Sequence, residues 1–238
     1  MAPNNLAANC SECFLAKKCI PSAIGLKDLN QFTNIVTTNI SLNNGDVLFK
    51  QGAPASVLYV IKSGTFKTQI TTPSGAEHIS HFFLPGDIIG LDSAARGRYR
   101  NSAYALEDSM VCKIAYRPLV KLRHKFPALS DFAVKAYSSG LASANETQNN
   151  IAIQAATSRL ATFLIRYHRR TTQFSCPLNN FILPMNRHDV SIHLGLAVET
   201  ISRSFTTLIK SGCISKEGKT VTIQDMPSLV EHANAPPR

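Results

Sequence analysis

The chain has 238 residues, enough for one large domain or two domains of ordinary size. It is 44% hydrophobic and 17% charged, which excludes a disordered chain, and its 25 Lys and Arg against 15 Asp and Glu suit a polyanionic partner. Neither an apolar run of membrane-spanning length nor a signal peptide is recognisable, so we expect a cytoplasmic protein whose six cysteines are reduced or bind metal.

Three cysteines lie close together near the N-terminus, in the segment NCSECFLAKKCI. Cys10, Cys13 and Cys19 fall in a stretch too short and polar to have a core of its own. Thiolates two residues apart can chelate a soft metal from one loop, and Lys17 and Lys18 favour the thiolate form. Zinc is the competing metal, although its structural sites usually combine two close pairs of ligands and no second pair is present. The spacing therefore predicts a metal or iron–sulfur site with a fourth ligand from elsewhere.

From about residue 40 to residue 114 the sequence is rich in short strands. Runs of β-branched and aromatic residues lie at 57–61, 66–71 and 78–83. Turn glycines recur between them, the last four being 12, 11 and 11 residues apart: Gly45, Gly52, Gly64, Gly75 and Gly86. Even spacing of short strands predicts an antiparallel barrel or jelly roll.

The remaining histidines and cysteines that could bind a metal have simpler explanations when each is taken alone. His78 and His81 are three residues apart, so on a strand they point to opposite faces and do not form the iron site of a jelly-roll oxygenase. We therefore predict no enzyme. Taken alone, Cys112 in the predicted strand SMVCKI is best explained as a small buried hydrophobe. Cys176 and Cys213 lack partners at ligand spacing and are interpreted as structural.

A long helix is predicted from about Asp131 to Ala155. Residues spaced by four and three form a weak coiled-coil seam along it: Tyr137, Leu141, Ala144, Gln148, Ile151 and Ala155. A marginal seam suits a dimer whose formation is regulated, whereas the alternative is a helix that packs on its own barrel. A further helix is predicted at 157–170 and a short strand at 181–184.

The segment RHDVSIHLGLAVETISRSFTTLI, residues 187–209, predicts two helices joined by a tight turn. Asn186 can cap the first helix, and Gly195 allows the turn. Apolar residues at spacings of three and four in the second helix leave Glu199, Ser202 and Arg203 together on the wet face. This pattern indicates a helix-turn-helix whose polar side chains can read base edges. The alternative is a buried helix pair with a solvated face.

A β-hairpin is predicted after Gly212, with strands at 214–215 and 220–223. Lys216 and Lys219 in its turn are placed for contacts with DNA phosphates.

The predicted fold class is α+β, with an antiparallel, jelly-roll-like β-roll, a long helix and a C-terminal winged helix-turn-helix. We divide the chain into a cysteine-rich segment, the β-roll, the long helix and the winged helix-turn-helix: 1–29, 30–126, 127–156 and 157–238.

Together these features resemble the CRP/FNR superfamily of transcription regulators, and within it the FNR branch of oxygen-responsive regulators. The resemblance covers nearly the whole chain. It rests on the spacing of the three N-terminal cysteines, on ALEDSMVCKI around Cys112, on LGLAVETISRSF and on the wing SGCISKEGKTVTI.

What this resemblance implies is a 4Fe–4S cluster on Cys10, Cys13, Cys19 and Cys112. It implies that cluster assembly without oxygen favours a homodimer, and that oxygen converts or destroys the cluster. The implied target is a palindromic promoter site in double-stranded DNA with TTGAT-like half-sites. RNA polymerase is an implied partner, and genes of anaerobic metabolism are the implied targets.

Three positions depart from the pattern of that branch. Lys18 stands where an apolar residue shields the cluster, and Phe14 replaces a small polar residue. Ala197 stands where Thr usually caps the recognition helix, and the loss of such a cap costs roughly 1 kcal/mol.

Cyclic-nucleotide control, found in a sister branch, is the main alternative. That branch uses a glutamate after a Gly-Asp-x-x-Gly turn to bind the ribose, and Leu91 stands at this position. Its Arg-Ser-Ala triplet is interrupted here by Asn101. A DNA-binding protein stapled by zinc is a further alternative.

Overall fold

The computed structural model describes residues 10–17, 19–24, 28–29, 32, 35–172 and 179–235. The chain divides into two compact units, Met1–Leu141 and Ala142–Arg238, and the long helix α4 (Ala128–Ile153) contributes to both. Within the described ranges, no helix is long and apolar enough to cross a membrane.

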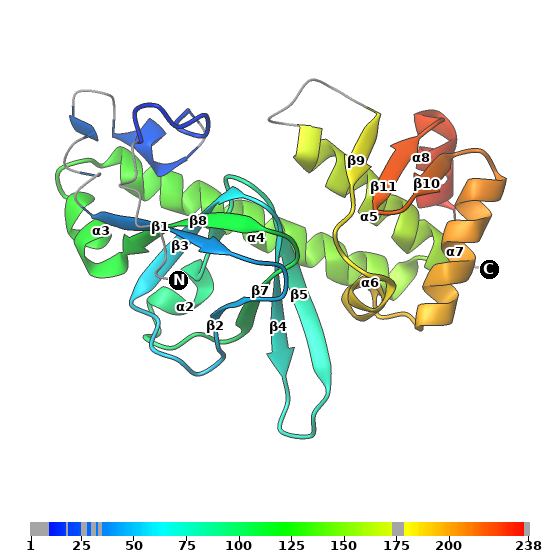
Figure 1. The fold of residues 1–238 in the computed structure, drawn as a ribbon, viewed down its shortest axis with the longest axis horizontal. Helices are drawn as coiled ribbons and strands as arrows, with labels where there is room; N and C mark the ends of the chain where they lie inside the picture. The colour runs from blue at the N-terminus through cyan, green and yellow to red at the C-terminus, as the bar shows by residue number, and fades with distance from the viewer. Residues whose placement is uncertain are drawn as a thin grey trace. The chain divides into compact units, whose positions relative to one another are not determined.

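The first unit is built on an antiparallel β-roll made of two four-stranded sheets (Figure 1). One sheet has the order β1-β8-β3-β6 and the other has the order β2-β7-β4-β5. The strands are β1 (Val36–Leu42), β2 (Val47–Phe49), β3 (Val57–Ser63), β4 (Phe66–Thr71), β5 (Glu77–Phe83), β6 (Ile88–Ile89), β7 (Ser102–Ala105) and β8 (Ser109–Ala115). The antiparallel roll predicted from the sequence is confirmed.

The turn glycines explain why the strands are so evenly spaced. All five predicted turn glycines have positive φ angles. At Gly64, between β3 and β4, φ is +84° and an added Cβ would lie 2.0 Å from the Ser109 Oγ. Glycine is therefore required at this turn both for its backbone conformation and for its lack of a side chain.

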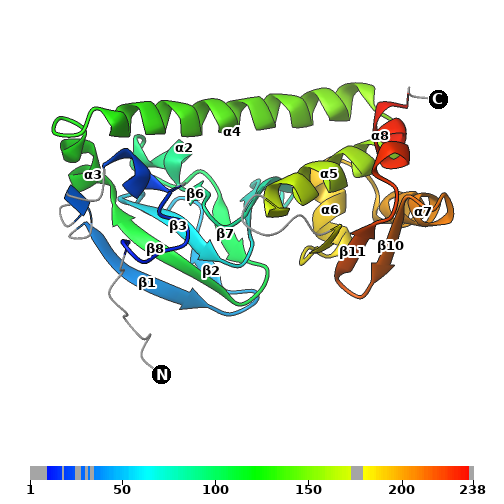
Figure 2. The same ribbon diagram turned by 90° about the horizontal axis from the view of Figure 1, so that it is seen from above.

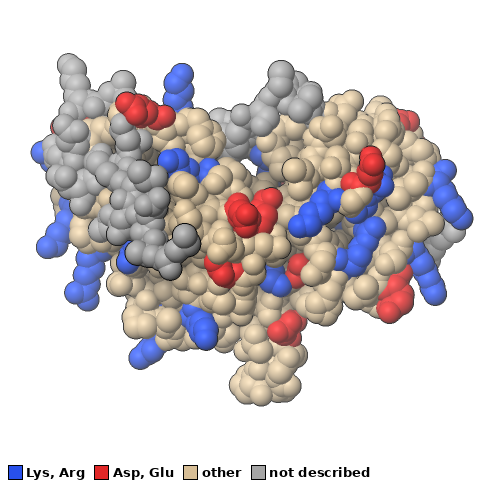
Figure 3. Space-filling model, in the orientation of Figure 1, with Lys and Arg blue, Asp and Glu red and all other residues tan. Residues whose placement is uncertain are grey.

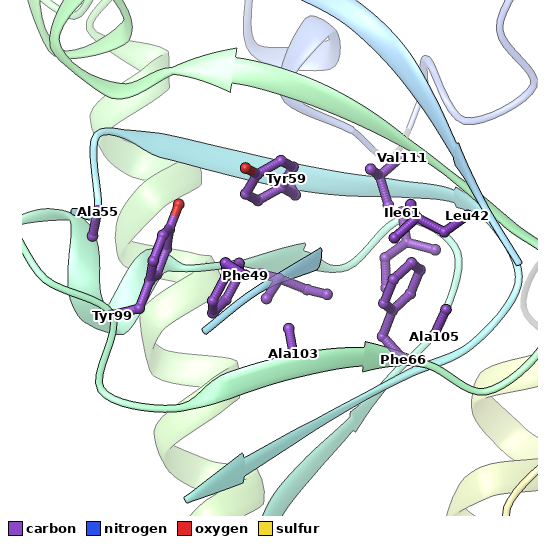
Figure 4. Packing of buried hydrophobic residues seen from close by; sticks show 11 residues of the cluster. Leu42, Phe49, Ala55, Tyr59, Ile61, Phe66, Tyr99, Ala103, Ala105 and Val111 are labelled. Atoms are coloured by element: carbon purple, nitrogen blue, oxygen red, sulfur yellow. The ribbon is translucent and has the colours of Figure 1, made fainter. Parts of the chain in front are cut away.

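Aromatic side chains from both sheets fill the interior of the roll (Figure 4). The rings of Phe49 and Tyr99 stack with their centroids 3.7 Å apart, and the Tyr59 ring lies 5.9 Å from that of Phe49. The Tyr99 hydroxyl donates a hydrogen bond to the Val57 carbonyl over 2.7 Å, as a buried phenol requires. The interior is thus a packed core.

A second apolar cluster forms on the other face of the β1-β8-β3-β6 sheet. Val36, Val60 and Ile114 belong to it, and so does Ile20 of the short 3-10 helix η1 (Ile20–Ala23). Because successive residues of a strand face opposite sides of a sheet, this cluster is separate from the interior of the roll. The helices α2 (Leu91–Ala94) and α3 (Tyr116–Leu122) accompany the N-terminal half of α4 here (Figure 2).

The second unit is a winged helix-turn-helix with two supporting helices. Its small sheet has the order β10-β11-β9, and the supporting helices α5 and α8 pack on each other. Its elements are α5 (Ala156–Thr171), β9 (Asn180–Ile182), α6 (Arg187–Leu194), α7 (Val198–Lys210), β10 (Ile214–Glu217), β11 (Thr220–Ile223) and α8 (Met226–Asn234). The predicted helix-turn-helix, hairpin and preceding helix are all present.

The junction between α4 and α5 differs slightly from the prediction. The helix α4 ends at Ile153, and Ala155 has an extended backbone as the N-cap residue of α5. The Gln154 amide donates to the Ala233 carbonyl over 3.2 Å, and Arg159 Nε donates to the Gln154 carbonyl over 2.9 Å. One local and one long-range hydrogen bond thus hold the residue that follows the helix, at a point that local periodicity does not mark.

Candidate metal centre and nucleic-acid interface

Four of the cysteines belong to one region of the first unit, although Cys112 is distant from the others in sequence. Cys10 and Cys13 lie in the irregular N-terminal segment, Cys19 is the N-cap residue of η1, and Cys112 is in β8. All four are free thiols and partly exposed, and Cys10, Cys19 and Cys112 pack against the second apolar cluster.

Burial and mutual repulsion act on these thiols. Burial, followed by repulsion from the nearby Cys112, Cys10 and Cys13, raises the pKa of Cys19 to about 12. Burial, followed by repulsion from Cys10 and Cys13, raises the pKa of Cys112 to about 11. Burial and then Cys13 raise the pKa of Cys10. Each thiol is therefore within electrostatic reach of others in the set.

The set is looser than the site of a single metal ion. Among the described residues, no group of three or more His, Cys, Asp or Glu side chains is arranged to hold one ion. A four-iron cluster takes one thiolate on each iron, so its ligands stand further apart than those of a single ion. Four sulfur donors in partly apolar surroundings fit the donor set of such a cluster.

Two polar residues that the sequence analysis did not single out lie beside these cysteines. The positive charge of Lys62 on β3 lowers the pKa of Cys10 and of Cys112, although burial outweighs it in both. The Cys112 thiol donates a hydrogen bond to the side-chain oxygen of Asn39 on β1 over 3.2 Å. Neither contact has a local sequence signature, because each depends on which strands are neighbours.

Of the two substitutions noted beside the N-terminal cysteines, only Phe14 lies within the described residues. Phe14 is 64% exposed, so its ring lies largely in solvent. Lys18 lies outside the described residues, and so does Cys176. Cys213 is fully buried in the second unit and accepts a hydrogen bond from the Ser211 hydroxyl, which agrees with a structural role.

The helix α6 has well-defined ends. The Asn186 side chain accepts from the Asp189 amide over 2.7 Å, and the Asp189 carboxylate accepts from the Asn186 amide, which forms a capping box. Gly195 ends the helix in the left-handed conformation with φ of 63°. Both residues that the sequence analysis placed at these ends therefore perform the expected task.

The helix α7 separates an apolar face from a polar one. Ile201, Phe205 and Leu208 are buried in the second unit. Glu199, Ser202 and Arg203 are all exposed on the other side. The N-cap residue Ala197 makes no side-chain hydrogen bond, as expected for the residue that replaces a capping Thr.

The wing places its two lysines in different environments. Lys219 is exposed, whereas Lys216 is partly buried and its ammonium donates to the Gly218 carbonyl. Lys and Arg side chains gather on the visible face of this unit around α6, α7 and the wing, with a few acidic side chains among them (Figure 3).

Arg187, the first residue of α6, is a cation that the sequence analysis did not assign to DNA. Its guanidinium lies over the Phe205 ring, and its Nη1 atom is buried without a hydrogen-bond partner. Burial lowers the pKa of Arg187; burial and then the charge of Arg187 lower the pKa of Lys216. Two partly buried cations are therefore close together at the start of α6 and the wing.

The predicted seam on α4 is solvent-exposed at its N-terminal end. Tyr137 is 46% exposed and Leu141 is 64% exposed. Val134, which the predicted seam omits, is 63% exposed and precedes Tyr137 by three residues, so it lies on the same face of the helix. Gln148 is exposed and Ala144 is partly exposed, while the Ile151 side chain lies outside the described residues. The Tyr137 hydroxyl donates to the Leu91 carbonyl over 2.8 Å, which ties the helix to α2.

A winged helix-turn-helix with an exposed polar face on its second helix is a DNA-binding unit, and its attachment to a β-roll defines a class of transcription regulators rather than enzymes. The family model described as "Cyclic nucleotide-binding domain" matches residues 39–125, and that described as "Crp-like helix-turn-helix domain" matches residues 158–232.

Curated relatives cover almost the whole chain. The "Anaerobic regulatory protein" of Pasteurella multocida is 37% identical over 225 residues, which are 94% of this chain and 82% of the relative. The "Fumarate and nitrate reduction regulatory protein" of Escherichia coli K12 is 35% identical over 227 residues, 95% of this chain and 91% of the relative. The chain belongs to the CRP/FNR family of DNA-binding transcription regulators.

Solved structures agree with this assignment. FixK2 from Bradyrhizobium japonicum has a TM-score of 0.75 and 25% identity, with 83% of this chain and 98% of that chain covered. A CRP/FNR-family transcriptional regulator from Thermus thermophilus has a TM-score of 0.65 and 21% identity, with 83% of this chain and 99% of that chain covered, and shows the shared fold.

Proposed function

We propose that this chain is an oxygen-sensing transcription regulator in which Cys10, Cys13, Cys19 and Cys112 hold a 4Fe–4S cluster. The observation that carries the proposal is that the three N-terminal thiols and the thiol of β8 lie in one region. Cys10, Cys13 and Cys112 each raise the pKa of at least one other thiol of this set. The family membership supports it, because relatives that span the chain are named for anaerobic regulation and for fumarate and nitrate reduction.

The protein's residues provide the ligands and their surroundings. Three thiolates come from the N-terminal segment and one from a strand fixed inside a four-stranded sheet. The second apolar cluster limits water on the sheet side, and Lys62 offsets part of the negative charge. The cluster, when bound, supplies the group that reacts with oxygen.

Dimerisation through α4 is the step that we expect the cysteine centre to control. Val134, Tyr137 and Leu141 form an exposed apolar stripe on α4, and we assign to it the start of the seam that continues through Ala144, Gln148 and Ile151. Packing with a second copy would bury this stripe. The Tyr137–Leu91 hydrogen bond offers a physical link between the seam and the first unit.

The dimer is proposed to bind a palindromic promoter site with TTGAT-like half-sites, about one helical turn apart. We assign base contacts to Glu199, Ser202 and Arg203, and phosphate contacts to Lys216 and Lys219. Regulation of anaerobic genes through contact with RNA polymerase is part of the proposal, and a protein that acts on promoter DNA works in the cytoplasm.

The test is the visible spectrum of protein purified without oxygen, together with its iron and sulfide content. A broad brown absorption that bleaches in air is expected, with about four irons per chain. A colourless anaerobic protein with stoichiometric zinc would instead favour the zinc-stapled alternative.

Cyclic-nucleotide control is the second candidate, because a cyclic nucleotide-binding family model matches the β-roll. Two observations weigh against it. The Leu91 side chain offers no acceptor to a ribose hydroxyl, and the stacked rings of Phe49 and Tyr99 occupy the interior of the roll (Figure 4). Calorimetry with cyclic AMP is expected to show no binding.

A further inference from the structure

Asn39 is a buried amide placed beside a thiol on an otherwise apolar face. Its side chain is 5% exposed. In the antiparallel pairing of β1 with β8, Asn39 is directly opposite Cys112, and the Cys112 Sγ lies 3.2 Å from the Asn39 Oδ1. On the other side of Cys112, the paired residue of β3 is Val60, which is buried and apolar.

Packing alone does not explain an amide at this position. The neighbours on this face include Val36, Val60 and Ile114, so an aliphatic residue would suit the surroundings and form the strand at least as well. Burying an amide without a partner costs free energy, and the hydrogen bond from the Cys112 thiol gives the Asn39 carbonyl oxygen a partner. The hydrogen bond with the Cys112 sulfur is therefore what explains an amide at position 39.

An amide can serve both states of the thiol. While the sulfur is protonated, the S–H donates to the Asn39 carbonyl oxygen. A metal-bound thiolate has no proton to donate, but the amide has an N–H group that can donate to the sulfur after rotation about its terminal bond. Hydrogen bonds to the ligand sulfurs hold their orientation and disperse their negative charge.

We propose that Asn39 is a positioning residue for Cys112, which holds the thiolate in place and donates a hydrogen bond to it when the cluster is bound. This inference rests on the proposed function, because it assumes that Cys112 is a cluster ligand. Removing the donor is expected to loosen the cluster and to shift its reduction potential to a more negative value, because a hydrogen bond to sulfur stabilises the more negative, reduced form.

A matched pair of substitutions tests the hydrogen bond separately from packing. The substitutions are Asn39→Val and Asn39→Thr. The two new side chains have nearly the same shape and both suit a strand, but only Thr offers a hydroxyl donor. Asn101→Val is the control, because Asn101 is similarly buried in the same unit and its amide donates to Asp92 rather than to a cysteine.

The measurements are made without oxygen on the full-length protein loaded with iron and sulfide. Loss of visible absorbance after addition of an iron chelator gives a rate of cluster loss, and a redox titration followed by absorbance gives the potential. We expect Asn39→Val to lose the cluster roughly 10–100-fold faster than the wild type. Asn39→Thr should recover most of this difference, and Asn101→Val should match the wild type.

Each outcome has a distinct meaning. If Asn39→Val retains the wild-type rate and potential, Asn39 has no role toward the ligand. If Asn39→Val and Asn39→Thr lose the cluster equally fast, the effect comes from packing and the hydrogen bond is overturned. A wild-type protein that takes up no cluster at all would instead overturn the proposed function.

Discussion

The guanidinium of Arg187 lies over the ring of Phe205, with its Cζ atom 3.3 Å from the ring centroid. This contact joins the first residue of α6 to the buried face of α7. It holds the Arg187 cation near Lys216 despite their repulsion, which a negatively charged group between them would relieve.

Arg187 is therefore predicted to contact a DNA phosphate. Arg187→Met keeps an apolar stem over Phe205 but removes the charge, so binding should weaken alike for specific and random DNA. The slope of log affinity against log salt should fall by about one. Arg169→Met, at an exposed arginine of α5, controls for net charge. A loss confined to one base pair would contradict the phosphate assignment.

Arg203 is predicted to read a base. Its side chain is exposed on α7, and its guanidinium matches the two acceptors of guanine. Arg203→Ala should cost about 1–3 kcal/mol at the specific site and relax the choice at one base pair. Titrations on the paired site, on a site with one G·C pair changed and on random DNA measure this. Equal weakening on all three would show that Arg203 contacts only the backbone.

The cysteine assignment predicts two groups of variants. Cys10→Ser, Cys13→Ser, Cys19→Ser and Cys112→Ser should each lower iron content and anaerobic DNA binding together, because a missing ligand leaves one iron open to exchange. Cys176→Ser and Cys213→Ser should retain the iron. Iron analysis after anaerobic purification provides the comparison, and a normal cluster in Cys112→Ser would show that β8 supplies no ligand.

The seam on α4 predicts a dimer that can be strengthened without the cluster. Ala144 is a small, partly exposed residue at a seam position. Ala144→Leu should add apolar contact worth about 1–2 kcal/mol and allow some dimer in air. Sedimentation in air and without oxygen measures this, and Leu141→Ser should act in the opposite direction. A wild type that is fully dimeric in both conditions would rule out the coupling.

The raised thiol pKa values predict how the iron-free protein responds to pH. Folding favours the neutral thiols, so their contribution to stability is present below their ordinary pKa of 9.0 and is lost as pH rises toward the folded values of about 11 and 12. Alkylation of Cys19 and Cys112 should therefore accelerate about tenfold per pH unit from pH 8 to 10. Mass spectrometry of the native and urea-unfolded protein tests this, and a plateau near pH 9 in the native protein would contradict it.

Local signals in the sequence were sufficient for much of this fold. The capping residue Asn186 and the turn glycine Gly195 define α6 within ten residues, and the turn glycines mark the strands of the roll. Contacts that depend on strand register or helix packing have no such signal. Asn39 meets Cys112 only because β1 pairs with β8, and Arg187 meets Phe205 only because α6 crosses α7.

The seam shows the same limit. The spacing of four and three residues correctly pointed to Tyr137 and Leu141 as exposed apolar residues. The predicted seam also included Ala155, which lies beyond the helix, and left out the exposed Val134. Gln154, just after the end of α4, donates a hydrogen bond to the distant Ala233 carbonyl, a contact that helical periodicity could not reveal.

The strand β8 carries neighbouring residues with separate tasks. Val111 is part of the packed interior of the roll, whereas Cys112 packs on the opposite face. A deletion of one residue early in β8 would exchange the two faces, placing the thiol among the aromatic rings and Val111 where iron is expected. The proposed iron site thus depends on which face of the sheet residue 112 occupies. Substitutions that face inward can change how firmly the roll folds while the sulfur stays in place.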